Sequence, residues 1–296
     1  MGAMSAFSKT FTLVTRNKKL YILPLIMSLI LAPLSAYMLS NSPFLQSNTP
    51  KSSQTHSGNV IIEEHGSLTS ETAIKGGLLR ILAMYAVVAL LLASIFQYSV
   101  VKGILKSLTE SEYSLSGVMV DGLRHFPGVL VLNFIFTLIA FLLVTLPILL
   151  VGLGAMAGNA GLILVVLGLL LIVLVGILSV SLTVLPVPIY AERGSLGSAF
   201  DALSLIFSNI RTIMAFGFLV LLVLVAIEIA ATPIAVITQI TASRGAVYIS
   251  ALAQAPLDAL LYFFMWTAGV ALYKELKRME DLKKVDRELD ELGLEF

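Results

Sequence analysis

The chain has 296 residues, of which 58% are hydrophobic and only 12% are charged, and its formal net charge is +1. A soluble domain is about a quarter charged, so this composition, with a mean hydropathy of +0.96, indicates an integral membrane protein. The absence of cysteine excludes a disulfide scaffold and any cysteine-ligated metal or iron–sulfur site. The small net charge provides no general basic surface for nucleic acid.

Six segments are long and apolar enough to cross a bilayer, which takes about 20 residues for about 30 Å of hydrocarbon. In chain order they are 20–39, 78–101, 129–153, 161–186, 213–240 and 247–273. The apolar run from Val129 to Tyr190 is about twice one span and must fold back on itself. Its turn residues gather between Gly152 and Gly161. We therefore expect an all-α, polytopic membrane protein with six transmembrane helices arranged as three hairpins.

An amphipathic segment precedes each hairpin, and we expect each to form a helix that lies in the membrane interface. The first opens with Ser5-Ala-Phe7 and the third with Ser198-Ala-Phe200, while the second ends at Phe126-Pro-Gly128. Five rings are the expected interfacial anchors: Phe7, Phe11, Phe126, Phe200 and Phe207.

This layout predicts a single six-span domain over residues 1–273. It divides into three repeat-like units, 1–101, 102–190 and 191–273. Any amphipathic helix before a span would look similar, so an internal repeat is a hypothesis. A long extracytoplasmic loop is expected over 40–77, in which Asn59–Thr69 could form a short hairpin.

The distribution of Lys and Arg predicts the orientation, because cytoplasmic loops carry the excess. Fifteen of the 19 basic residues fall on the side of the two termini and of the segments 102–128 and 190–212. We therefore expect a multi-pass protein of the plasma membrane with both termini in the cytoplasm. An alternative interpretation makes 20–31 the core of a signal peptide cleaved near Ala36, but the repeat-like layout argues against it.

Two acidic residues lie near the middle of apolar spans, Glu228 in the fifth and Asp258 in the sixth. A charge at the bilayer centre costs about 2.5–3.5 kcal/mol on the scale from membrane-insertion experiments, which gives the lowest values. Both acids should therefore face the bundle or water. Helical spacing puts further polar groups on the same faces, namely Thr232 and Gln239 with Glu228, and Gln254 and Tyr262 with Asp258. This polar seam is either a proton or cation site or a set of hydrogen-bonded groups that specify helix packing.

The stretch Pro188-Ile-Tyr-Ala-Glu192-Arg-Gly194, followed by Ala199, Ser204 and Asn209 before a span, resembles a pattern in a broad prokaryotic group of six-helix membrane proteins. That group includes the membrane domain found ahead of some glycerophosphodiester phosphodiesterases. The resemblance implies the six-helix architecture. No hydrolase domain follows in this chain, so the resemblance implies no catalytic residue.

The tail, residues 274–296, is predicted to be a charged cytoplasmic helix that continues the sixth span. Its apolar stripe includes Leu276, Leu282 and Val285. It is either a solvated helix or an element for docking a protein partner or for self-association.

No residue pattern in the chain points to an enzyme, a cofactor or a metal site, and the expected partner besides a protein is the lipid bilayer. The function we predict is a non-catalytic membrane module that assists envelope or lipid processes or a partner protein. The alternative is a carrier of ions, small solutes or lipids that uses the polar seam.

Overall fold

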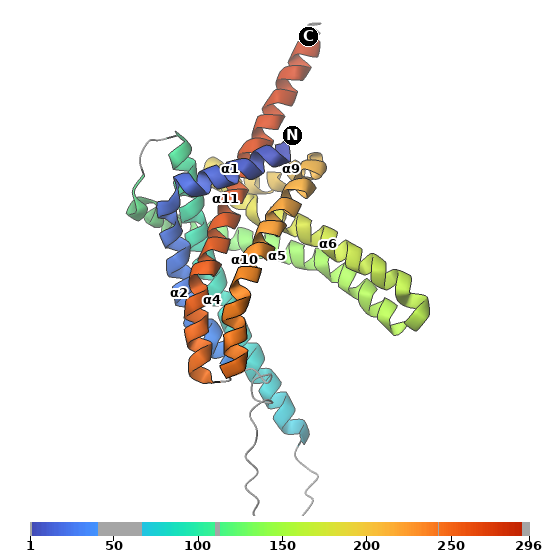
Figure 1. Ribbon diagram of the computed structural model, residues 1–296. Helices are drawn as coiled ribbons and strands as arrows, with labels where there is room; N and C mark the ends of the chain where they lie inside the picture. Colours follow the sequence, from blue (N-terminus) through green and yellow to red (C-terminus); the bar gives the residue numbers. More distant parts are fainter. Residues whose placement is uncertain (1, 41–66, 110–112, 242, 292–296) are drawn as a thin grey trace, which may run out of the picture.

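The computed structural model describes residues 2–40, 67–109, 113–241 and 243–291, and every regular element within them is a helix (Figure 1). Six of these helices are long and apolar enough to cross a membrane, and they cover the six predicted spans. The predicted fold class is therefore confirmed, and the chain is a multi-pass membrane protein. Gly2 and Glu291 lie at the same end of the bundle, which we call the terminal side (Figure 1).

The first unit consists of α1 (Gly2–Arg16), the 3₁₀ turn η1 (Lys18–Tyr21) and α2 (Ile22–Ser40). Helix α1 is amphipathic and buries Ala6, Thr10 and Leu13. It crosses α11 on the terminal side (Figure 1), and its position in the membrane interface stays a prediction.

Helix α4 (Ser67–Thr109) is longer than the predicted second span at both ends. Residues 67–77 of the expected loop 40–77 are helical, so the predicted strand at Ser67–Thr69 is wrong, whereas the extracytoplasmic position of the loop stays a prediction. Once a helix exists, each further residue adds one hydrogen bond for one residue fixed, so a span readily continues beyond the hydrocarbon. The remainder of the predicted hairpin, 59–66, lies outside the described residues.

The second hairpin is formed by α5 (Leu115–Met156), the turn η2 (Gly158–Gly161) and α6 (Leu162–Val184). The turn lies within the predicted glycine cluster, and Gly158 adopts a positive φ of 59°. Figure 1 shows that the far end of this hairpin lies apart from the other helices. Its apolar side chains, among them Met156 at 87% exposure, are not covered by other helices and are therefore available for contact with lipid.

The expected second interfacial helix is not a separate element. Its residues form the first turns of α5, which continues through Pro127 without ending. Proline removes one backbone hydrogen bond, and a long helix can absorb this loss as a kink. Gly128 serves packing, because a Cβ atom there would lie 2.5 Å from the Tyr190 hydroxyl.

The third unit begins with three short helices, α7 (Pro186–Arg193), α8 (Leu196–Ala199) and α9 (Asp201–Ser208). The last two occupy the expected third interfacial segment. They lead into α10 (Ile210–Thr241) and α11 (Arg244–Glu291). Helix α11 contains both the sixth span and the described part of the tail, as the sequence predicts.

Small residues allow the spans to approach closely. A Cβ atom at Gly217 of α10 would lie 2.6 Å from the Ile177 carbonyl oxygen of α6, and one at Gly269 of α11 would lie 2.5 Å from that of Val184. Between α4 and α5, the Asn133 side-chain amide donates to Gln97 Oε1 at 2.9 Å. Helices α10 and α11 thus both pack on α6, and they also contact each other, which positions the sites described next.

Candidate functional site

The two predicted acids of the polar seam lie on helices that contact each other, near enough for their charges to interact. Asp258 on α11 is half-buried, and the charge of Glu228 on α10 acts on it directly. Glu228 is exposed on the surface of α10.

Two of the predicted neighbours accompany Asp258. Gln254, one turn away on α11, forms a side-chain hydrogen bond to the Asp258 carboxylate. Tyr262, one turn further on, lies within electrostatic reach of Asp258, and its ring packs 5.6 Å from that of Trp266. Tyr85 of α4 interacts electrostatically with both Asp258 and Tyr262. Tyr85, Glu228, Gln254, Asp258 and Tyr262 form what we call the acidic cluster.

Thr232 does not join the acidic cluster through its hydroxyl group. Its Oγ1 donates to the backbone carbonyl of Glu228 at 3.2 Å, the usual local bond of a threonine inside a helix. The side chain of Gln239 lies outside the described residues.

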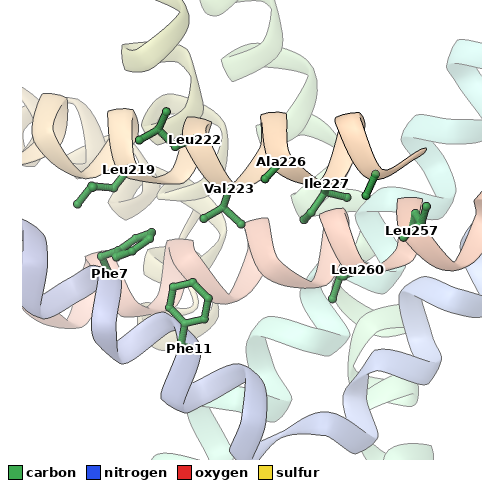
Figure 2. A pocket seen from close by; sticks show the side chains of 10 residues that line it. Phe7, Phe11, Leu219, Leu222, Val223, Ala226, Ile227, Leu257 and Leu260 are labelled. Carbon is green, nitrogen blue, oxygen red and sulfur yellow. The ribbon is translucent and has the colours of Figure 1, made fainter. Parts of the chain in front are cut away.

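An apolar groove of about 530 Å³ lies on the other side of α10, between α1, α10 and α11. Figure 2 shows the side chains of the three helices turned toward it. Its lining consists of hydrocarbon side chains: Phe7, Phe11, Leu219, Leu222, Val223, Ala226, Ile227, Ala230, Leu257 and Leu260. Glu228 is two residues, or about 200° around the helix, from both Ala226 and Ala230. The groove and the acidic cluster are therefore separate places.

A second cavity, of about 500 Å³, continues along α1 toward α2. It is lined by Val14, Thr15, Lys18, Tyr21, Leu260 and Phe263, and we call it the Lys18 cavity. Leu260 lines both this cavity and the groove. The Tyr21 hydroxyl donates to the Pro256 carbonyl at 2.7 Å, which ties the first span to α11 at the wall of the cavity.

On the terminal side, ion pairs hold α11 to the elements around it. Glu275 is buried and accepts from Lys9 of α1 at 2.6 Å and from Arg278 at 2.5 Å. Glu192, at the end of α7, accepts from Lys274 at 2.7 Å and from Lys277 at 2.6 Å. We call these four pairs the α11 clamp; three of them join α11 to another element, and the pair of Arg278 with Glu275 lies within α11. Both acids follow apolar segments and are followed by basic residues, which is a weak signal in the sequence.

The predicted interfacial anchors take different positions. Phe7 and Phe11 pack edge to face at 5.1 Å, and both line the groove. Phe200 packs 5.8 Å from Phe136 of α5. Phe126 is half-buried, whereas Phe207 is 69% exposed. Burial of these rings in lipid headgroups stays a prediction.

Comparison of the chain with models of known protein families, with curated proteins and with solved structures finds no match. The resemblance of residues 188–209 to the six-helix prokaryotic group therefore stays a prediction. The described part of the chain has three features that could serve a function: the acidic cluster, the two cavities beside α1, and the α11 clamp.

Proposed function

We propose that this protein is a non-catalytic module of the plasma membrane that serves an envelope or lipid process, or a partner protein, through its C-terminal helix. The observation that carries the proposal is α11, a single helix that contains the sixth span and runs on to Glu291. Beyond the α11 clamp, Leu282 and Val285 are 52% and 50% exposed. Their spacing of three residues puts both on one side of the helix, where an apolar strip suits contact with another helix.

The α11 clamp supports a docking role for this end of the helix. Glu275 ties it to α1, and Glu192 ties it to α7, so two different elements hold its base. Lys283 also donates to the Asn209 side chain at 3.2 Å, just before α10. A helix held at its base presents its free end in a defined direction, and this lowers the entropy lost when a partner binds.

The proposed orientation puts both termini and the segments 102–128 and 190–212 in the cytoplasm. It is supported by the 15 of 19 Lys and Arg residues that belong to that side. The apolar strip on α11 would then meet soluble proteins or a second copy of this chain.

Cysteine cross-linking in native membranes tests the docking role, since the chain has no cysteine of its own. Leu282→Cys should cross-link into one discrete adduct, either of twice the mass of the chain or of a larger defined mass. Lys284→Cys is the matched control, because it lies two residues, or about 200°, around the same helix. Equal cross-linking at the two positions, or none at either, would overturn the docking role.

A second function, a carrier, is favoured by one observation: Glu228 and Asp258 interact electrostatically although they come from different spans. Acids that share a site can exchange a proton or coordinate a cation. The two described cavities are lined by other residues, and neither includes these acids. The module is therefore the function that we favour.

A further inference from the structure

We propose that the Lys18 cavity and the apolar groove together bind one anionic phospholipid. Its phosphate would lie at Lys18, and one acyl chain would pass Leu260 into the groove. This inference is independent of the docking role, because it uses the membrane-spanning part of α11 together with α1 and α10, whereas docking uses α11 beyond the clamp.

The two cavities form one path along a single flank of α1. Phe7 and Phe11 line the groove, and Val14 and Lys18 line the Lys18 cavity. Phe7, Phe11 and Val14 are four and three residues apart, which is the spacing of one helical face, and Lys18 begins the η1 turn that follows α1. On α11, Leu260 belongs to both cavities. A flexible chain that starts at Lys18 can therefore reach the groove without leaving the protein surface.

The groove has the length and chemistry of an acyl-chain site. It follows α10 from Leu219 to Ala230, eleven residues, which corresponds to about 16 Å along a helix. One leaflet of a bilayer contributes about half of the 30 Å of hydrocarbon, so the groove spans about one leaflet. Every lining side chain is a hydrocarbon, which leaves a polar ligand nothing to hydrogen-bond.

Lys18 supplies the charge that selects the headgroup. Other lysines of the terminal side are engaged: Lys9, Lys274 and Lys277 pair with acids, and Lys102 donates to a backbone carbonyl. In the described part of the chain Lys18 has neither an ion pair nor a hydrogen bond, although it lines a cavity. Lys19 adds a second exposed cation beside it. A phosphate is the natural partner for such a site, since basic pockets beside transmembrane helices bind anionic headgroups.

A lipid fits these features better than a transmembrane helix of a partner. A helix is about 10–12 Å across with its side chains and would have to fill the groove and the Lys18 cavity as one straight rod. An acyl chain is narrow and can bend at Leu260. A helix that lay in the groove alone would make no use of the unpaired Lys18.

The test is a lipid titration of the purified full-length protein in mild detergent, followed by native mass spectrometry. Phosphatidylglycerol and phosphatidylcholine with identical acyl chains are compared. We expect tighter binding of phosphatidylglycerol, and Lys18→Gln should weaken it about fivefold, the effect of one cation near an anionic headgroup. Lys19→Gln is the matched control and should change it less, because Lys19 does not line the cavity.

A second pair of variants tests the acyl chain and does not depend on the charge. Ala226→Phe fills the groove and should weaken both lipids, whereas Val225→Phe, at an exposed neighbouring position outside the lining, should leave both unchanged. Equal affinity for the two lipids, equal effects of the two lysine variants, or unchanged binding to Ala226→Phe would each overturn the proposal. A dimer that Ala226→Phe abolishes would likewise overturn it in favour of a second copy in the groove.

Discussion

The geometry of the α11 clamp predicts how much single substitutions lower the free energy of unfolding. Glu275 is a buried carboxylate that two half-exposed cations neutralise, Lys9 at 2.6 Å and Arg278 at 2.5 Å. Lys9→Met removes one charge-assisted hydrogen bond and leaves the carboxylate with Arg278 and the Ser5 side chain as its partners. Hydrogen bonds to charged groups contribute about 1.5–3 kcal/mol each, and buried charges that lose a partner cost more. We expect Lys9→Met to lower the free energy of unfolding by about 2–3 kcal/mol.

Removal of the Glu275 carboxylate should abolish the free-energy cost of a buried carboxylate that lacks one of its partners. In Glu275→Leu the two cations can turn to water, so the loss should be about 1 kcal/mol or less. The double variant Lys9→Met with Glu275→Leu should therefore be more stable than Lys9→Met alone by at least about 1 kcal/mol. Lys274→Met is the matched control, because its partner Glu192 is partly exposed and keeps Lys277 at 2.6 Å.

The only tryptophan, Trp266, is buried on α11 two turns before Glu275 and reports unfolding by fluorescence during a detergent denaturation series. If the double variant is as unstable as Lys9→Met, or less stable, the penalty does not come from a buried unpaired carboxylate. A Lys274→Met variant that loses as much as Lys9→Met would show that the exposure of the acid does not matter.

Three further predictions concern orientation, the interface and the acidic cluster. Single cysteines at Ser53 and Ser195 should be labelled from outside the cell only at Ser53, and labelling at Ser195 alone would reverse the proposed orientation. Phe200→Glu should reduce the amount of folded protein more than Asp201→Ala does. Phe200 packs on Phe136, whereas Asp201 makes an exposed ion pair with Arg193. Equal amounts of folded protein for the two variants would argue against burial of the Phe200 ring. If the acids only specify packing, Glu228→Gln should leave the protein stable and should not change any pH-dependent flux in proteoliposomes. Loss of such a flux would favour the carrier.

The sequence predicts the six spans because composition alone decides them in a bilayer. Backbone groups in hydrocarbon must be hydrogen-bonded within the segment, so each long apolar run has to be helical. The ends of the helices are less predictable, because a helix can continue into water. Helices α4, α5 and α11 all extend well beyond the predicted spans. The second interfacial segment is predicted to end at Phe126-Pro-Gly128, yet α5 continues through Pro127, and Gly128 allows a close approach of Tyr190.

The acidic cluster is predictable in part for the same reason. The depth of Glu228 and Asp258 follows from counting residues from the turn between α10 and α11, and this count is local. Tyr85 belongs to α4, and its arrival beside Asp258 depends on which helices are neighbours. Helix neighbours are set by close contacts such as Gly269 against Val184, which one sequence does not reveal. The Lys18 cavity escaped prediction for a similar reason, since four of its residues flank the α1–α2 connection and two come from α11.

Helix α10 separates two candidate ligand sites in the membrane part of the chain, the acidic cluster and the apolar groove. One side of it carries Glu228 and faces the acidic cluster, and the other carries Ala226 and Ala230 and lines the apolar groove. A substitution on one side therefore changes one function without the other, because the two faces share no lining residue. The carrier would need water to reach Glu228, whereas the lipid site needs only the bilayer in which the chain already lies. Lipid binding therefore needs no path for water through the protein. It is compatible with a rigid bundle whose C-terminal helix, held by the α11 clamp, contacts a partner.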